Sequence, residues 1–318
     1  MPTRLESAIC GGMTQEATTQ PLKAALCILS AMAMLGCIDN FVYRISEEIG
    51  LWQMQAVRSV LALVLIGALS ALGYGTLRPK RLSTAALRSA FVATSMLLYF
   101  GSLAFLPIAQ SLAGLFTSPI WVLVLSAVAL GMPIGPVRIG AVVLGFIGTL
   151  MVLQPDPANL SLVTVMPVAA GLLYALGALA TRRWCLEETT LCLLAGFMAI
   201  LGLWGVLGLA ALTVFPQAVP PGPDGFLVRG WVPMSPAIWG FVLVQAVGSV
   251  IGVGLIIKAY QLGETATVAV FEYAIILFAS FFAFLFFGQL LNGLAMGGVA
   301  LVIAAGSLIA LRGRTEVA

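Results

Sequence analysis

The sequence predicts an all-α membrane protein whose ten transmembrane helices form two inverted five-helix repeats. Composition is the first observation: 61% of the 318 residues are hydrophobic, only 8% are charged, and the mean hydropathy is +1.10. Soluble domains average about 25% charged residues, so this chain is suited to a lipid bilayer. The second observation is a series of ten apolar runs, and the third is an internal duplication.

Five apolar runs in the first half each have about the 20 residues that a helix needs to cross the hydrocarbon core. They cover residues 22–41, 54–74, 85–104, 109–130 and 136–153. Charges, Pro or Gly separate them, in the segments RISEEIG, GTLRPKR, FLP and GMPIG. Residues 1–21 lack the charged start, apolar stretch and cleavage site of a signal peptide, and we expect them to form a cytoplasmic tail.

Five further runs make up the second half of the chain. They cover residues 163–181, 191–215, 237–257, 266–287 and 291–311. Their boundaries fall in QPDP, in RRWCLEE, in a Pro-rich stretch, in KAYQLGE and in GQL. The runs predict a first repeat over residues 22–156 and a second over 157–318, the latter ending in a short cytoplasmic tail.

The cations predict the orientation of the spans, because Lys and Arg near span ends resist translocation. With the N-terminus inside, only Arg44, Arg58 and Arg229 of the fifteen cations fall outside. Both termini are then cytoplasmic, and residues 215–236 become the one long external loop, which we interpret as a connector. We expect a multi-pass protein of the plasma membrane, in a bacterium the inner membrane.

The residue counts exclude several classes of function. The chain has no histidine, which removes the usual metal ligand and general base. Its net charge of +3 is too small and scattered for a nucleic-acid surface. The five cysteines show no CxxC spacing, so we infer no disulfide framework. We expect no catalytic residues, no metal and no cofactor.

The two halves of the chain are similar in sequence. AFLPIAQSLAGLFTSPIWVLVLSAVALG corresponds to AYQLGETATVAVFEYAIILFASFFAFLFFGQ. The alignment places Ala104 on Ala259 and Phe116 on Phe271 at one offset, and after a gap it places Gly131 on Gly288 and Gly140 on Gly297. Five spans per half is an odd number, so the second half enters the membrane in the opposite orientation. Such inverted repeats are typical of transporters with a central site.

Four segments make this chain resemble the drug/metabolite transporter superfamily, in particular its ten-span branch of two EamA-type domains. They are QAVRSVLAL, LPIAQSLAGLFTSPIWV, IKAYQLGETATVAVFEY and GGVALVIAAG. The resemblance implies a central cavity surrounded by spans one to four and six to nine, with spans five and ten packed outside it. It also implies secondary transport, and members of this family commonly export amino acids and related metabolites.

Glu272 is the leading candidate for a functional residue. It is the deepest acid in the chain, about 10 Å into the ninth span at 1.5 Å per residue. Charges at such depth are costly and usually functional, although a structural pair with Lys258 is the alternative. The alignment sets Thr117 on Glu272, so both are expected to face one cavity. Lys258 itself either binds substrate or extends to the lipid headgroups.

Two further polar features are candidates. Asp39, Asn40 and Arg58 lie near the outer ends of the first two spans and form either a gate or, as we favour, a structural ion pair. Pro119 cannot donate a backbone hydrogen bond, so it should kink the fourth span beside Thr117 and Ser118. This kink exposes backbone groups to substrate or serves packing alone.

Aromatic residues lie deep within the expected spans and either line a cavity for an amphipathic substrate or belong to the core. They are Tyr99, Trp121, Tyr174 and Tyr273. A tyrosine hydroxyl is poorly satisfied in lipid, so the three tyrosines are expected to face protein or water.

The expected partners are a small-molecule substrate and the lipid bilayer, with no nucleic acid. Glu272 offers a route for coupling to protons, and a facilitator without coupling fits the same residues. Pairs of small residues four apart fit close helix contacts and are compatible with a homodimer. These pairs are Ala141 with Gly145, Gly248 with Gly252, and Gly293 with Gly297.

The predicted function is a secondary transporter that exports amino acids or related metabolites by alternating access. Import of a nucleotide-derived cofactor, a sugar or a drug-like solute is the alternative among transporters. A membrane-embedded enzyme or a non-transporting receptor is the alternative from another class. No HExxH, GxSxG or GxxxxGK[ST] motif occurs, which argues against an enzyme and against ATP-driven transport.

Overall fold

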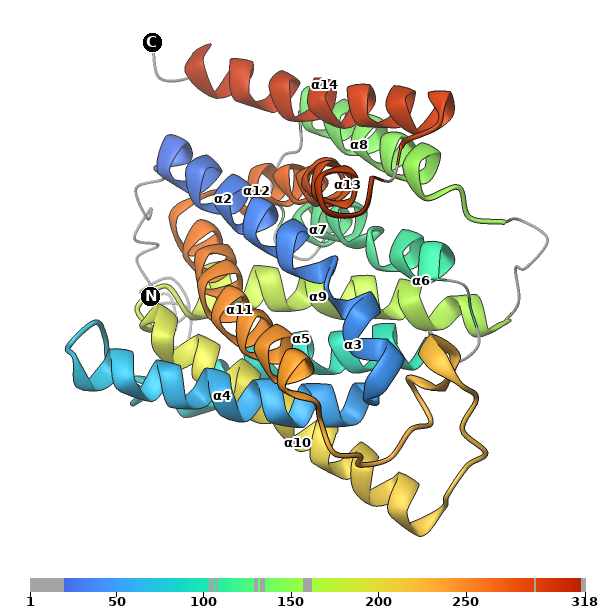
Figure 1. Ribbon diagram of the computed structural model, residues 1–318. Helices are drawn as coiled ribbons and strands as arrows, with labels where there is room; N and C mark the ends of the chain where they lie inside the picture. The colour runs from blue at the N-terminus through green and yellow to red at the C-terminus, as the bar shows by residue number, and fades with distance from the viewer. Residues whose placement is uncertain are drawn as a thin grey trace.

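A computed structural model describes residues 20–102, 106, 108–128, 131, 135–156, 162–288 and 290–315. Within these ranges the regular structure is entirely helical, and the helices pack side by side in one bundle (Figure 1). Nine helical stretches of the described residues are long and apolar enough to cross a membrane, and a shorter apolar helix, Gly293–Ile309, follows them. The all-α membrane class that the sequence predicts is confirmed.

The helices of the first half follow the expected order. They are α2 (Pro21–Asp39), α3 (Val42–Glu48), α4 (Leu51–Ala71), α5 (Leu82–Ser102), α6 (Ile108–Leu115), α7 (Ser118–Val128) and α8 (Pro136–Leu153). Pro136 stands in the first turn of α8, where its missing N–H costs nothing. Helix α3 was not expected: residues 42–48 continue the first span for another two turns instead of forming a connection.

The second half contains five long helical stretches and two short 3₁₀ turns. They are η2 (Leu162–Thr164), α9 (Val165–Trp184), α10 (Thr190–Val214), η3 (Gly222–Gly225), α11 (Pro236–Leu262), α12 (Thr265–Glu272), α13 (Ala274–Phe287) and α14 (Gly293–Thr315). Helix α11 ends five residues beyond the expected end at 257, because Lys258 points out of the bundle and does not terminate the helix.

Helices α8 and α14 pack against each other at one side of the bundle, next to α7 and α13 (Figure 1). Close approach is possible because Gly148 of α8 faces Gly298 of α14: a Cβ added at Gly148 would lie 2.6 Å from the carbonyl oxygen of Gly298. Gly248 and Gly252 similarly bring α11 against α2, where they meet Ile38 and Leu35. Gly148, Gly248, Gly252 and Gly298 thus serve contacts within the chain.

The backbones of the two halves share corresponding features. The fourth span is broken between α6 and α7, and the ninth span is broken between α12 and α13. Beyond these helices, Gly131 and Gly288 adopt left-handed φ values of 62° and 65°. The sequence alignment pairs the same two glycines. A left-handed residue that ends a helix favours glycine, which pays no Cβ penalty there.

The long loop after α10 is more than the simple connector that we expected. Its Arg229 is buried and donates hydrogen bonds to the carbonyl oxygens of Ser46 (2.9 Å), Ile49 (3.3 Å) and Gly222 (2.7 Å). The carboxylate of Glu48 accepts hydrogen bonds from the backbone N–H and the hydroxyl of Ser235. The loop therefore folds back onto α3 and the start of α4.

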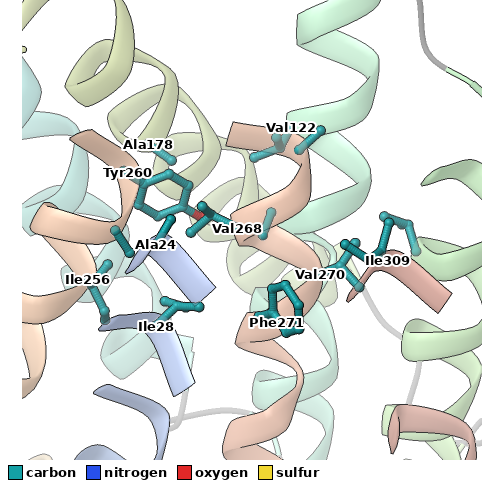
Figure 2. Close-up of a cluster of buried hydrophobic side chains, with 14 of the residues drawn as sticks. Ala24, Ile28, Val122, Ala178, Ile256, Tyr260, Val268, Val270, Phe271 and Ile309 are labelled. Atoms are coloured by element: carbon teal, nitrogen blue, oxygen red, sulfur yellow. The ribbon is translucent and has the colours of Figure 1, made fainter. Parts of the chain in front are cut away.

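The largest buried apolar cluster surrounds α12 and joins it to α2, α7, α9, α11 and α14. Figure 2 shows ten of its members labelled: Ala24, Ile28, Val122, Ala178, Ile256, Tyr260, Val268, Val270, Phe271 and Ile309. The hydroxyl oxygen of Tyr260 is a polar atom within this otherwise apolar cluster (Figure 2). The cluster holds α12 in the middle of the bundle, and α12 carries Glu272 at its end.

Candidate functional site

The broken fourth and ninth spans meet each other inside the bundle. Helix α6 ends at Leu115 and α7 begins at Ser118, directly before Pro119. The hydroxyl of Tyr273, at the break of the ninth span, donates to the carbonyl oxygen of Phe116 over 3.3 Å. Because a helix break leaves backbone groups outside the regular hydrogen-bond ladder, this junction is a polar point at membrane depth.

Two glycines allow the junction to form. A Cβ added at Gly145 of α8 would lie 2.3 Å from the ring of Tyr273, so only glycine leaves room for that ring. A Cβ added at Gly171 of α9 would lie 2.6 Å from Oγ1 of Thr117. The Thr117 hydroxyl donates to the carbonyl oxygen of Gly114 at 2.7 Å. Its hydrogen is therefore already used within the fourth span.

Glu272 lies at the end of α12 and is 6% exposed. The hydroxyl of Tyr174 on α9 donates to its Oε1 atom at 2.7 Å. Tyr260 of α11, 1% exposed, interacts electrostatically with the same carboxylate, although its hydroxyl has no partner with hydrogen-bond geometry. Lys258 is exposed and forms no ion pair with Glu272.

Arg88 adjoins this polar set through Tyr174. It is the seventh residue of α5 and only 3% exposed, and it is one of the cations that the predicted orientation assigns to the cytoplasmic side. Its Nε atom donates to Oγ1 of Thr181 at 2.9 Å, and its charge acts on Tyr174. Its Nη1 atom is buried without a partner. We call Arg88, Tyr174, Tyr260 and Glu272 the Glu272 group.

A second polar set lies on α2, α4 and α5, toward the other end of α5 from Arg88. Asp39 ends α2 and interacts electrostatically with Arg58 of α4 and Tyr99 of α5. Arg58 donates a hydrogen bond to Gln55, and no direct ion pair joins it to Asp39. Asp39 is exposed, whereas Glu272 is not. We call Asp39, Gln55, Arg58 and Tyr99 the Asp39 group.

The remaining candidates from the sequence lie outside these two groups. Asn40 donates to the carbonyl oxygens of Gly36 (2.7 Å) and Ala279 (3.2 Å), so its role is to join α2 to α13. Ser118 is buried at the start of α7. Trp121 packs against the cluster of Figure 2, and its Nε1 atom has no partner.

Lys258 borders a cavity of about 370 Å³ at the ends of α4 and α11. Glu188 and Gln261 also line it. Both side chains make hydrogen bonds within the protein. Glu188 accepts from the backbone N–H groups of Lys80 and Arg81, and Gln261 donates to the backbone carbonyl oxygens of Cys185 and Glu188. These contacts tie the helix ends together, so the cavity is bounded by structural groups.

Sequence reasoning missed Arg88 and Tyr260 as members of the site. Arg88 stands inside the expected span 85–104, and a cation within an apolar run is the same signal that selected Glu272. Tyr260 lies beyond the expected end of the eighth span at 257, so its burial could not be anticipated. Tyr174 and Glu272, from distant parts of the chain, were both candidates and are in contact.

The side chains of the Glu272 group determine which ligand chemistry this part of the bundle can recognise. Among the described residues, no group of three or more His, Cys, Asp or Glu side chains could hold a metal ion. The Glu272 group instead offers one carboxylate, one guanidinium and two phenolic hydroxyls, with aromatic surface from the tyrosines. Such a mixture of aromatic surface and a few convergent polar groups is typical of small-molecule sites.

Residues 22–154 match the EamA-like transporter family. A riboflavin transporter of Vibrio cholerae is 24% identical over 289 residues, covering 89% of this chain and 91% of the relative. A riboflavin transporter of Rhizobium johnstonii is 30% identical over 113 residues, covering 32% of this chain and 37% of the relative. A crystal structure of a protein that is 16% identical covers 93% of this chain and 99% of that protein, with a TM-score of 0.76.

These matches agree with the helical bundle and with the resemblance seen in the sequence. The shared fold extends over nearly the whole chain, because the crystal structure superposes along 93% of it. The family match covers the first half, which contains spans one to five. The first half of the chain therefore carries an EamA-like transporter domain of the drug/metabolite transporter superfamily, within a multi-pass helical membrane protein.

Proposed function

We propose that this protein transports riboflavin, or a closely related flavin, across the plasma membrane by alternating access. One observation carries the proposal: a curated relative that aligns along 91% of its own length is a riboflavin transporter. A second relative with the same name matches over a shorter segment. At 24% and 30% identity the relatives support flavins as the substrate class. Transport measurements on this protein identify the substrate itself.

The two polar groups are consistent with an elongated, neutral solute. Arg88 and Tyr99 both lie on α5, eleven positions apart, which corresponds to about 16 Å along the helix axis. The Glu272 group and the Asp39 group are therefore separated along the membrane normal. Riboflavin has an aromatic ring system at one end and a polyhydroxyl chain at the other, so each end can meet one polar group.

Transport into proteoliposomes tests the proposal directly. We expect the purified protein to accumulate radiolabelled riboflavin and to exchange it against unlabelled riboflavin preloaded inside. Expression in a riboflavin auxotroph should lower the riboflavin concentration needed for growth. Vesicles without protein and vesicles that contain the Glu272→Gln variant serve as controls. Equal uptake in vesicles with and without the protein would refute the proposal.

Export of an amino acid is the second candidate, and one observation favours it. Each polar group contains one cation and one acid, Arg88 with Glu272 and Arg58 with Asp39. An amino acid carries both charges and could pair with either set. A panel of labelled amino acids in the same proteoliposomes separates the two functions: amino-acid counterflow without riboflavin uptake would favour this candidate.

A further inference from the structure

The cavity of about 370 Å³ lies where α10 begins and where α4 and α11 end. Lys258 of α11 is the one cation in its lining. This lysine is exposed, and it forms no ion pair with any carboxylate of the described residues. The cavity is therefore a space of ligand size that carries one unpaired positive charge.

The other polar groups in the lining are already bonded within the protein. Glu188 is 5% exposed, and its two carboxylate oxygens accept from the backbone N–H groups of Lys80 (2.9 Å) and Arg81 (2.7 Å). The hydroxyl of Thr190 donates to Oε1 of Gln261 at 3.2 Å. The ammonium group of Lys258 is therefore the charge that a ligand in the cavity would meet.

Lys258 stands in line with an apolar stripe on α11, formed by Val244, Val247 and Ile251. All three side chains are exposed, and Lys258 follows Ile251 by seven residues. Residues three, four and seven apart share one face of a helix, and other residues of α11 pack against α2, α4 and α10. Since α11 belongs to a candidate membrane span, the stripe faces the acyl chains, and Lys258 lies about 10 Å beyond its last member.

The surface between the stripe and the cavity is open at Gly254. This glycine lies three residues after Ile251 and four before Lys258, so it is on the same face of α11. A Cβ added there would lie 3.7 Å from Leu194 and 4.0 Å from Thr190, both on α10. Because glycine has no side chain, the groove between α10 and α11 is uncovered at this point.

We propose that the cavity binds the headgroup phosphate of an anionic phospholipid, with an acyl chain lying along the α11 stripe. Basic pockets between transmembrane helices bind such headgroups, and a lysine near a span end directs its ammonium group to the headgroup level. The ammonium of Lys258 pairs with the phosphate, and the cavity holds the rest of the headgroup. The chain passes from the stripe across Gly254 to reach it.

The charges around the cavity favour an anionic lipid over a zwitterionic one. A choline or ethanolamine headgroup would bring a second cation next to Lys258, and like charges repel. Glu188 offers that cation little, because both of its oxygens are already bonded to backbone N–H groups. A glycerol headgroup carries hydroxyls instead, so its phosphate pairs with Lys258 without a like-charge contact.

A lipid titration tests the assignment on the purified protein in a neutral detergent. Phosphatidylglycerol and phosphatidylcholine with the same acyl chains are added, and the rise in unfolding temperature gives the half-saturating concentration of each lipid. Phosphatidylglycerol should half-saturate at an about fivefold lower concentration, the effect of one basic residue near an anionic lipid surface. Equal values for the two lipids would overturn the proposal. Equal stabilisation by inorganic phosphate or glycerol 3-phosphate would show a site for free phosphate and would also overturn it.

Lys258→Gln removes the charge at an exposed position, so its unfolding temperature without lipid should equal that of the wild type. Its half-saturating concentration should rise about fivefold for phosphatidylglycerol and stay unchanged for phosphatidylcholine. Lys80→Gln, at an exposed lysine paired with Glu187, is the control and should keep the wild-type preference. An unchanged preference in Lys258→Gln would contradict the proposal.

The path of the acyl chain is tested separately. Gly254→Leu places a side chain in the groove between α10 and α11, so it should raise the half-saturating concentrations of both lipids at least about threefold. Gly240→Leu adds the same side chain at an exposed position of α11 with nothing within 4 Å, and it should bind both lipids like the wild type. Equal lipid affinities of these two variants would contradict the proposed path.

Discussion

At the residue scale, the surroundings of Glu272 favour a carboxylate that can change its charge during transport. Its hydrogen bond comes from a tyrosine hydroxyl, and no cation among the described residues forms a direct ion pair with it. A carboxylate in a direct ion pair would leave a buried cation alone on protonation, which costs several kcal/mol. Hydrogen bonds to tyrosine can rearrange instead, so Glu272 is suited to coupling.

Glu272→Gln is expected to lower transport at least tenfold, because glutamine keeps the size and one acceptor but removes the charge. If Glu272 couples transport to protons, the residual rate should also no longer respond to an imposed pH gradient. The measurement is riboflavin uptake in proteoliposomes at several pH values. Glu187→Gln, at an exposed position with a surface pair to Lys80, should behave like the wild type. Normal transport by Glu272→Gln at every pH would show that the carboxylate is structural.

The sequence could predict the depth of the polar residues but only some of their contacts. Glu272 and Tyr174 could be selected because each stands inside an apolar run. Lys258 was a reasonable partner by sequence distance, yet fourteen residues along α11 and α12 do not place it on the same side as Glu272, and it is exposed. Arg88 could not be recognised as a partner, because contacts between α5 and α9 depend on tertiary packing.

At the element scale, the two broken spans form the structural centre of the site. Pro119 accounts for the break in the fourth span, since it lacks the N–H that would bond the carbonyl of Leu115. The ninth span breaks at Tyr273 without a proline, and there the Tyr273 side chain fills the space left by Gly145. The sequence therefore predicts the first break by chemistry, whereas it did not predict the break in the ninth span.

Gly171→Ala is expected to disturb the junction of the broken spans. Its new Cβ would lie 2.6 Å from Oγ1 of Thr117 and 3.0 Å from the carbonyl oxygen of Leu115, so α9 must move away. Overpacking of this kind costs about 1–3 kcal/mol, and transport should fall with it. Gly67→Ala, in α4 with nothing within 4 Å, is the control and should be neutral or stabilising by up to about 1 kcal/mol. Thermal unfolding in detergent measures both, and equal stability of the two variants would contradict the expectation.

The loop of residues 215–235 is expected to contribute to stability through Arg229. Arg229→Met removes donors from the carbonyl oxygens of Ser46, Ile49 and Gly222 and leaves them in a buried place. The loss should be about 2 kcal/mol or more, measured by thermal unfolding. Arg44→Met removes an exposed cation paired with Glu47 on the same side and should cost well under about 1 kcal/mol. Similar unfolding temperatures for the two variants would mean that the loop is a connector after all.

At the scale of the whole molecule, the apolar runs and the duplication predict the fold class, because both are patterns of residue type that need no knowledge of tertiary contacts. The ten apolar runs correspond, among the described residues, to nine helical stretches long enough to cross a membrane and one shorter apolar helix. Gly131 and Gly288, which the alignment pairs, take the same left-handed conformation. The division into repeats over residues 22–156 and 157–318, the homodimer and the orientation in the membrane stay predictions. Packing of α8 against α14 uses glycines within one chain, so those glycines give no argument for a second copy.

Both termini are expected in the cytoplasm, with the loop of residues 215–235 outside, because Lys and Arg near span ends resist translocation. A cysteine at Gln217, which is exposed in that loop, should react with a membrane-impermeant maleimide on intact cells. A cysteine at Leu77, exposed between α4 and α5, should react only after the cells are permeabilised.

Native Cys185 gives little background because it is buried, and burial raises the pKa of its thiol to about 11, so it stays protonated at neutral pH. The other native cysteines are replaced by serine or alanine. The reverse pattern, with Leu77→Cys labelled on intact cells and Gln217→Cys protected, would invert the orientation, and it would then place the Asp39 group on the cytoplasmic side.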